Sequence, residues 1–198
     1  MDALLVATTN AGKTREIRLA LEGLPLTLLT LADVPPVQEP DETGRTFADN
    51  ARLKASYYAA ASGQFTVAED SGLVIDAIGG RPGVESARYP GPTYAEKFAG
   101  LYRELALHPR PWTARFVCSL AVVSGREPDH VLFSVEATVE GEIAASPRGT
   151  NGFGYDPIFY FPPYGTTLAD VDDARKLAAS HRGKAFRDLK RWLGQSQI

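Results

Sequence analysis

Short apolar runs and helical patterns follow one another along the first part of the chain. The run Ala3–Ala7 predicts a buried strand, and Leu26–Leu31 predicts a second strand. Between them, a polar loop from Thr8 to Lys13 leads into Thr14–Leu21, where apolar residues recur at helical spacing. A strand, loop and helix in this order bind phosphate when the helix N-terminus points at the ligand.

A longer helix is predicted for Phe47–Ala61. Thr46 is a suitable N-cap, with Asp49 three residues further on in a capping-box arrangement. One face of this helix carries small apolar residues at four-residue spacing, while Asn50 and Lys54 share another face one turn apart. A helical lysine usually faces solvent, but Lys54 lies between two acidic segments of the sequence and is therefore also a candidate ligand contact.

The middle of the chain predicts a helix and two strands. Tyr94–Leu105 is amphipathic, and the β-branched and aromatic segments Arg115–Val123 and Val131–Val139 indicate an antiparallel pair joined by a turn around Gly125–Asp129. A strand at Ile158–Phe161 and a helix at Thr167–Ala179 follow, and Ser180 is expected to cap a last helix.

The most informative stretch is an apolar run that ends in two acids. Phe65–Ala68 leads into Glu69 and Asp70, and Ser71-Gly72 follows, where the chain can turn. We expect a buried strand that presents a metal ligand or a general base at its end. A separate acidic loop at residues 39–42 adds carboxylates, and Mg²⁺ is usually held by one or two carboxylates with substrate phosphates and waters.

Composition narrows the class of protein. The 198 residues suit one domain, or one domain in two lobes, with a 44% apolar and 23% charged content that is ordinary for a globular protein. The formal net charge of -3 provides no polybasic nucleic-acid footprint. Cys118 is the only cysteine, so internal disulfides are excluded. The N-terminal apolar run is too short for a signal peptide or a membrane span, and we expect a cytosolic enzyme without nucleic-acid or membrane partners.

The first loop resembles a phosphate-binding P-loop only in part. Gly12-Lys13-Thr14 follows a strand, but the P-loop pattern requires a glycine where this chain has Ala7. Free N–H groups at the helix start and the charge of Lys13 still favour an anion there. A P-loop-like NTPase or kinase, and a non-catalytic nucleotide- or nucleic-acid-binding protein, therefore remain alternatives.

A glycine-rich loop at Gly149–Asp156 has neither helical nor strand period. Its glycines permit a positive φ or close approach to a ligand, and Phe153 and Tyr155 offer aromatic faces on which a base could stack, unless they belong to the core. Further on, Lys176 and the segment Ser180–Lys184 supply point charges and a planar guanidinium. These side chains are expected either to contact a ligand or to lie on the surface.

Taken together, the motifs resemble the Ham1 family, the inosine triphosphate pyrophosphatases. The matching stretches are Thr8-Thr9-Asn10-x-x-Lys13, Glu42-Thr43-Gly44-x-Thr46-Phe47-x-x-Asn50-Ala51, Asp70-Ser71-Gly72-Leu73, Pro82-Gly83-x-x-Ser86-Ala87-Arg88-Tyr89, Phe153-Gly154-Tyr155-Asp156-Pro157-Ile158-Phe159 and Ser180-His181-Arg182-Gly183. No single stretch is diagnostic, but six in the same order span nearly the whole chain and are highly specific.

The resemblance implies an activity and a fold. The activity is hydrolysis of the non-standard purine triphosphates ITP, dITP and XTP to the monophosphate and pyrophosphate, with a divalent cation, Mg²⁺, and a homodimer. The fold implied is α/β, with an elongated mixed β-sheet flanked by helices and two lobes that enclose a nucleotide cleft, all within one domain of residues 1–198. A Maf-like pyrophosphatase acting on dTTP or UTP is the nearest alternative.

The resemblance also implies roles for individual residues. Asp70 is the catalytic acid and a metal ligand, and Glu42 is the second metal acid. The expected substrate contacts are Thr8, Thr9, Asn10, Ala11, Gly12, Lys13, Lys54, Ser71, Phe153, Gly154, Tyr155, Asp156, Lys176, His181 and Arg182.

The chain departs from the family pattern at three positions. Thr8-Thr9 stands where Ser-Gly or Thr-Gly is common, and Leu177 stands where Asn is usual. Glu69 replaces a frequent Asp, and we expect it to be a tolerant neighbour of Asp70 or a partner of the metal through a water molecule. None of these departures removes a predicted catalytic group.

Overall fold

The computed structural model describes residues 2–195, in which the chain divides into two compact units. The first unit comprises the chain up to Asp70, Cys118–Ala137 and the segment from Arg182 onward. The second comprises Ser71–Val117 and Thr138–His181. That the two units form a single two-lobed domain remains a prediction.

Within residues 2–195, seven strands form one sheet in the order β2-β1-β3-β4-β5-β6-β7. Their bounds are β1 (Ala3–Val6), β2 (Thr27–Thr30), β3 (Thr66–Ile75), β4 (Thr113–Ser124), β5 (Glu127–Ile143), β6 (Phe159–Phe161) and β7 (Thr166–Thr167). β1 is parallel to β2 and β3, whereas β6 is antiparallel to β5 and β7. The sheet is therefore mixed, which confirms the predicted α/β class.

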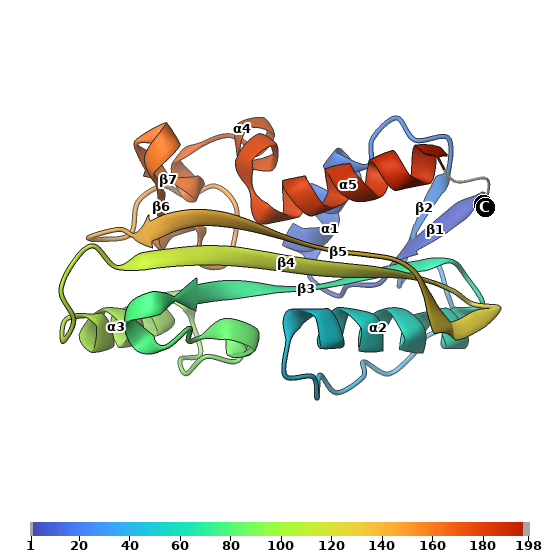
Figure 1. Cartoon of the computed structure of the whole chain (residues 1–198), viewed down its shortest axis with the longest axis horizontal. Helices are drawn as coiled ribbons and strands as arrows, with labels where there is room; N and C mark the ends of the chain where they lie inside the picture. The colour runs from blue at the N-terminus through green and yellow to red at the C-terminus, as the bar shows by residue number, and fades with distance from the viewer. Residues whose placement is uncertain (1, 196–198) are drawn as a thin grey trace. The chain divides into compact units, whose positions relative to one another are not determined.

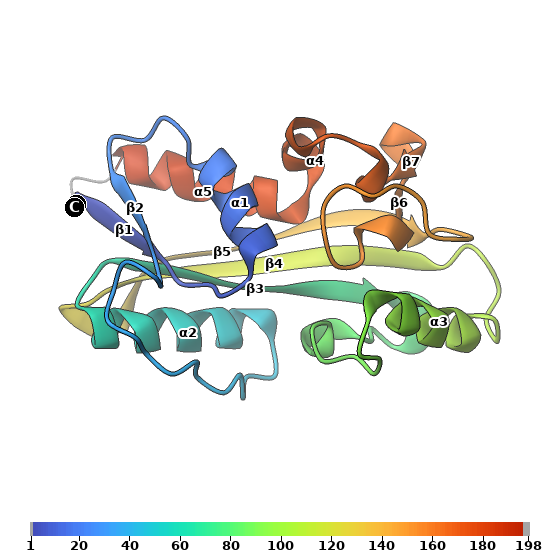
Figure 2. The ribbon, with the colours of Figure 1, turned by 180° about the vertical axis from the view of Figure 1, so that it is seen from behind.

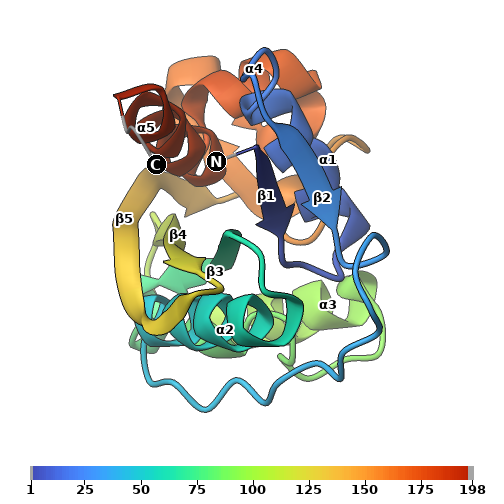
Figure 3. The ribbon, with the colours of Figure 1, turned by 90° about the vertical axis from the view of Figure 1, so that its right-hand side faces the viewer.

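The first unit places helices on both faces of its part of the sheet. α1 (Ala11–Ala20) and α5 (His181–Gln195) cover one face, and α2 (Phe47–Ser62) covers the other (Figures 1 and 3). The Thr46 side chain accepts a hydrogen bond from the Asp49 N–H at the start of α2, and Gly63 ends the helix at a φ of 69°. Small residues such as Ala55 and Ala59 are fully buried, so α2 lies close to the sheet.

The second unit has its own apolar core. α3 (Tyr94–Leu105) begins with the capping box of Thr93 and Glu96 and buries Leu101 and Leu105 completely. Within this unit, α3 lies on one face of the sheet and α4 (Asp173–Ala179) lies on the opposite face (Figure 2). Within residues 2–195, every helix is too short or too polar to span a membrane.

Several predicted boundaries move in the structure. α1 begins at Ala11 rather than Thr14, because the Asn10 side chain caps it by accepting from the Lys13 N–H at 3.1 Å. β4 and β5 are longer than predicted and are joined by only Gly125 and Arg126. A Cβ at Gly125 would lie 2.2 Å from the carbonyl carbon of Gly63, so only glycine fits this turn.

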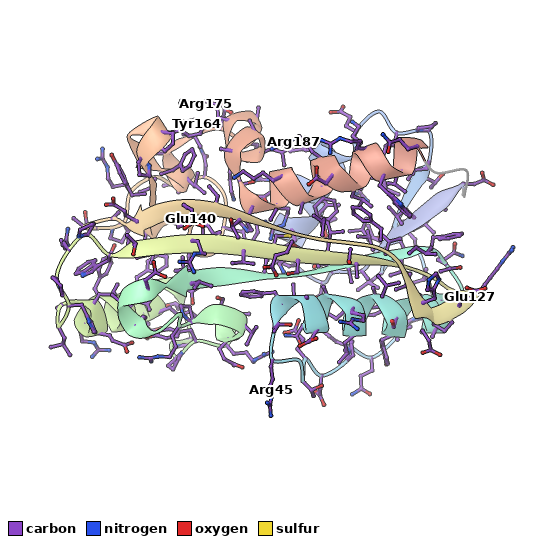
Figure 4. All side chains as sticks on the ribbon, in the orientation of Figure 1. Arg45, Glu127, Glu140, Tyr164, Arg175 and Arg187 are labelled. Atoms are coloured by element: carbon purple, nitrogen blue, oxygen red, sulfur yellow. The ribbon has the colours of Figure 1, made fainter. Side chains whose placement is uncertain are left out.

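The predicted helix at Thr167–Ala179 is wrong in its first half. Thr167 belongs to β7, a 3₁₀ turn covers Leu168–Asp170, and α4 begins only after Asp172, whose side chain accepts from the Arg175 N–H. The Tyr164 hydroxyl donates to the Arg175 carbonyl at 3.0 Å, and the guanidinium lies 4.6 Å from the Tyr164 ring centroid (Figure 4). These contacts fix where α4 starts.

Candidate active site

Asp70 lies in the middle of β3, which corrects the prediction that it ends a strand. The strand continues through Ser71-Gly72 to Ile75, because β3 pairs with β4 in the sheet. The Leu73 N–H also donates to the Ser86 Oγ at 2.9 Å, and Val74 forms an isolated bridge with Pro82. Ser71-Gly72 therefore remains extended instead of forming a turn.

Glu69 and Asp70 point to opposite faces of β3, since side chains alternate along a strand. Asp70 meets α2, and Glu69 meets α1 and α5, in agreement with the placement of those helices on opposite faces (Figure 3). The two adjacent acids thus belong to two different clusters.

Asp70 is 6% exposed, and its carboxylate has partners on α2. Asn50 Nδ2 donates to its Oδ2 at 3.0 Å, and Lys54 Nζ lies 3.5 Å from its Oδ1. Lys54 Nζ also donates to Glu42 Oε1 at 2.5 Å, so one ammonium contacts both acids that were predicted to bind metal. The structure therefore brings Glu42, Lys54 and Asp70 together.

Burial raises the pKa of Asp70 above its ordinary value, and the nearby Glu42 adds to this effect. Lys54 and the Asn50 hydrogen bond act in the opposite direction without cancelling it. Burial alone would lower the pKa of Lys54, but Asp70 and Glu42 raise it above its ordinary value. Lys54 thus stays charged, while Asp70 is a stronger base than an exposed aspartate.

The donor set at Glu42 and Asp70 fits a hard divalent cation. Both carboxylates reach the same positive group, the Lys54 ammonium, so their oxygens can converge on one centre. Among residues 2–195, no group of three or more His, Cys, Asp or Glu side chains could hold a metal ion. Two carboxylates completed by phosphate oxygens and waters are the arrangement that Mg²⁺ favours.

The predicted phosphate loop forms the accessible start of α1. The Asn10 N–H donates to Thr8 Oγ1 at 3.2 Å, and Thr9 Oγ1 donates to Glu39 Oε1 at 3.4 Å. Ala11 and Gly12 open the helix, and Ala11 is exposed. Helix starts of this kind present N–H groups and a partial positive charge to an anion.

Glu69 is the centre of a buried ionic cluster. Its Oε1 accepts from Arg182 Nε at 3.1 Å and Nη2 at 3.0 Å and lies 3.1 Å from Lys13 Nζ. The Cys118 thiol donates to its Oε2 at 2.8 Å, and Arg182 Nη1 donates to Glu16 Oε2 at 2.6 Å. Glu69 is 3% exposed, so the prediction of a tolerant neighbour does not fit its position.

The charges around Glu69 determine its protonation. Burial alone would raise the pKa of Glu69, but Arg182 and Lys13 more than offset burial and hold it well below its ordinary range. Burial and the Glu69 charge raise the pKa of the Cys118 thiol well above its ordinary value. Glu69 is therefore an anion and Cys118 a neutral thiol throughout the physiological pH range.

Arg182 is 2% exposed, and its Nε, Nη1 and Nη2 all donate to carboxylates of the first unit. Sequence reasoning missed this role, because nothing in the order of residues pairs Arg182 with Glu16 or Glu69. Its contact with a base remains a prediction.

The second unit holds the glycine-rich loop in a defined shape. Asp156 Oδ2 accepts from the Phe153 N–H at 2.8 Å and from Lys176 Nζ, which also lies 4.8 Å from the Phe153 ring centroid. Gly152 has a φ of 73°, and a Cβ there would lie 2.2 Å from Asp156 Oδ2. The structure thus brings together Phe153, Asp156 and Lys176, and their contact with a base remains a prediction.

Tyr155 belongs to the core rather than to a stacking surface. It is 4% exposed, its ring lies 5.4 Å from that of Tyr94 and 6.0 Å from that of Phe98, and its hydroxyl donates to the Ser86 carbonyl at 2.8 Å. The expectation that a base stacks on this ring is wrong. Phe153 is half-buried and remains the candidate.

The other predicted residues of the second unit are Ser71, Gly154 and His181. Ser71 is half-buried on β3, and Gly154 follows Phe153 with a φ of 66°. His181 is 4% exposed, and its ring stacks on Phe116 at 4.8 Å between centroids.

The fold and these clusters define an α/β protein with a helix start suited to phosphate and a buried acid beside a lysine. The chain belongs to the Ham1 family, whose model matches residues 4–192. The match covers nearly the whole chain and confirms the resemblance drawn from the six sequence motifs.

Curated relatives and solved structures agree with this membership. A dITP/XTP pyrophosphatase of Geobacter sulfurreducens is 46% identical over the full length of both chains. The Listeria monocytogenes dITP/XTP pyrophosphatase is 41% identical over 98% of this chain and 96% of its own. The structure of a Ham1 protein from Coxiella burnetii is 37% identical, with a TM-score of 0.87 over 99% of this chain and all of its own.

Proposed function

We propose that the protein hydrolyses the non-canonical purine triphosphates dITP, XTP and ITP to the monophosphate and pyrophosphate, and so removes them from the nucleotide pool. The supporting relatives are full-length matches named as dITP/XTP pyrophosphatases. The observation that carries the proposal is Asp70, a buried acid with a raised pKa that Asn50 and Lys54 hold in a fixed position.

Asp70 acts on the attacking water. Its carboxylate orients the water and accepts its proton as the water oxygen forms a bond to the α-phosphorus and the bond to pyrophosphate breaks. Without a cation bound, burial raises the pKa of Asp70, and this burial makes its carboxylate a stronger base than that of an exposed aspartate. Lys54 stays charged beside Asp70 and offsets negative charge on the phosphates.

Glu42 and Asp70 are the residues that would hold Mg²⁺. Bound there, the cation offsets the charge that develops on phosphate oxygens. The contact of Lys54 with both carboxylates supports this assignment, because two acids that share one ammonium lie close together.

We assign the triphosphate to the loop at the start of α1. Thr8, Thr9, Asn10, Ala11 and Gly12 supply hydroxyl and N–H groups, and Lys13 supplies a charge. Ser71, which follows Asp70 on β3, adds a further hydroxyl. These groups suit an anionic substrate because the helix start carries partial positive charge.

We assign base recognition to the loop of the second unit. Phe153 is the stacking surface, and Gly154, Asp156, Lys176 and His181 are the other base contacts that we propose within this unit. A 6-oxo purine accepts a hydrogen bond where adenine donates one, so a donor at this point selects against adenine. A buried donor facing an amino group is left unpaired, at a cost of about 1–3 kcal/mol.

The experiment is a competition for turnover among ITP, XTP, dTTP and GTP with Mg²⁺. We expect ITP and XTP to be used in preference to dTTP and GTP. A preference for dTTP would instead support a Maf-like pyrophosphatase, and orthophosphate as the first product would support a P-loop-like NTPase. Arg45→Gln is a suitable control for the site variants, because Arg45 is exposed and points away from the ribbon (Figure 4).

We also propose a homodimer, on the strength of the family resemblance. Light scattering on a size-exclusion column tests this proposal, with about twice the 21.4 kDa chain mass as the expected result.

A further inference from the structure

Ion pairs around Glu69 join two acids and two cations among the described residues 2–195. Glu16 and Glu69 supply two negative charges, and Lys13 and Arg182 supply two positive ones. Three of the side chains are at most 5% exposed, whereas the Lys13 side chain is 16% exposed. Lys13 is therefore the member of this cluster that a substrate can reach most readily.

Lys13 occupies an electrostatically unfavourable place on its own helix. It lies in the first turn of α1, where the helix dipole repels a cation, and this turn carries no acidic residue. An unpaired lysine at this position would move its ammonium away from the helix start. Glu69 Oε1, 3.1 Å from Lys13 Nζ, supplies the opposing attraction from β3.

The Glu69 carboxylate is itself held from two sides. Arg182 donates twice to Oε1 from α5, and the Cys118 thiol donates to Oε2 from β4. α1 and α5 lie on the same face of the sheet, so both cations approach Glu69 from that face (Figure 1). The Glu69 carboxylate is therefore held in place, while the Lys13 side chain is longer and more exposed than that of Glu69.

We propose that Glu69 is a positioning residue of the phosphate site, which holds the Lys13 ammonium at the N-terminus of α1 and acts on the reaction through Lys13. This inference rests on the proposed function, because it assigns Lys13 to the substrate phosphates. It does not require Glu69 to touch the substrate or a metal.

A double-mutant cycle tests the proposal. Glu69→Gln removes the charge with little change in size, and Lys13→Met removes the ammonium. We expect Glu69→Gln to lower kcat/KM for ITP by about 10- to 100-fold when Lys13 is present, since a misplaced charged group costs about that much. In the Lys13→Met background the same substitution should change kcat/KM less than about twofold.

Binding of inorganic pyrophosphate, measured by calorimetry, provides a readout that does not require turnover. We expect Glu69→Gln to weaken pyrophosphate binding when Lys13 is present and to leave it unchanged in the Lys13→Met background. A purely structural role would lower the unfolding temperature without this dependence on Lys13.

Two further variants guard against misfolding and against general disturbance of the cluster. Glu69→Asp keeps the charge beside Arg182 but withdraws the carboxylate by one methylene, and we expect a loss of about threefold that also disappears with Lys13→Met. Cys118→Ala removes the donor to Oε2 and leaves the contact with Lys13. Its effect on kcat/KM should combine with that of Lys13→Met additively.

The inference would be overturned if the effects of Glu69→Gln and Lys13→Met on kcat/KM were additive. If Glu69→Gln does not fold, additive effects of Glu69→Asp and Lys13→Met would overturn it. Its failure is distinguishable from failure of the proposed function. A wild-type protein that releases no pyrophosphate from ITP or XTP contradicts the function, while the pyrophosphate affinities of the variants still test the role of Glu69.

Discussion

At the scale of single residues, two adjacent acids of β3 have opposite electrostatic environments. Burial raises the pKa of Asp70, whereas Arg182 and Lys13 overcome burial and lower the pKa of Glu69. Asp70 is therefore suited to accept a proton, and Glu69 to remain an anion that holds cations.

Asp70→Asn should abolish turnover while the protein becomes more stable at neutral pH. The raised pKa means that the folded state binds the Asp70 proton more tightly than the unfolded state, a contribution that is lost as pH rises through the folded pKa. At pH 7 the ionised group thus opposes folding, and Asn removes that opposition. We expect kcat to fall about 10²- to 10⁴-fold and calorimetry to show a higher Tm, with Arg45→Gln unchanged in both. A lower Tm for Asp70→Asn would contradict this account of its environment.

A direct titration of Asp70 should report the same environment. Burial raises the pKa of Asp70 above its ordinary value, which is about 3.9 in peptides, when no cation is bound beside it. We expect NMR of the Asp70 carboxyl group without Mg²⁺ to give a midpoint above that value, and addition of Mg²⁺ to lower the midpoint, because a bound cation favours the carboxylate. A midpoint at or below the ordinary value without Mg²⁺ would be inconsistent with a raised pKa.

Glu69→Gln should destabilise the protein by about 3–5 kcal/mol at pH 7, because it leaves buried cations uncompensated. The lowered pKa of Glu69 gives stability that is present above its unfolded value, about 4.3, and is lost as pH falls below that value. Urea unfolding at several pH values measures both effects. We expect the variant to lose less stability than the wild type between about pH 5 and pH 3; equal losses would show that Glu69 does not titrate as inferred.

At the scale of elements, the glycine-rich loop is fixed by one carboxylate. Asp156 accepts from the Phe153 N–H and from Lys176, and Gly152 provides the space for these contacts. The conformation of the loop, more than the identity of its aromatic residues, places Phe153.

Gly152→Ala should raise the KM for ITP at least about tenfold, because its Cβ would collide with Asp156 Oδ2 and displace Phe153. Gly79→Ala is the matched control: its φ of 69° is close to the 73° of Gly152, but a Cβ there meets nothing within 4 Å. Both variants bear a similar backbone strain, so the difference in KM isolates the collision. Equal KM values for the two variants would argue against a role of this loop in substrate binding.

The sequence predicted elements whose signals are local. The capping residue Thr46 and the apolar stripe of α2 are both visible in the chain, and the predicted start of α2 is confirmed. The interpretation of Ser-Gly as a turn puts Asp70 at a strand end, but pairing with β4, which is distant in sequence, carries β3 on to Ile75. Long-range partners override local turn preference in such cases.

Contacts between residues distant in sequence also limit how much of the candidate site could be predicted. The spacing of Asn50 and Lys54 places them on one helical face, so their joint approach to Asp70 follows from a local pattern. The pairing of Glu69 with Arg182 joins residues 113 positions apart, and no periodicity reports it. Only the fold brings these two side chains together.

At the scale of the whole molecule, the Ham1 match over residues 4–192 includes both compact units. Asp70, Lys13 and Lys54 belong to the first unit, as does the start of α1. The loop of Phe153 belongs to the second unit. The proposed activity therefore divides phosphate chemistry and base recognition between segments that are far apart in the sequence.

The phosphorus atom that water attacks distinguishes the proposed pyrophosphatase from a phosphatase. ITP is hydrolysed in water enriched in oxygen-18, with Mg²⁺, and the products are separated and analysed by mass spectrometry. We expect one labelled oxygen in inosine monophosphate and unlabelled pyrophosphate, because water attacks the α-phosphorus. Label in pyrophosphate, or release of labelled orthophosphate with inosine diphosphate, would contradict it.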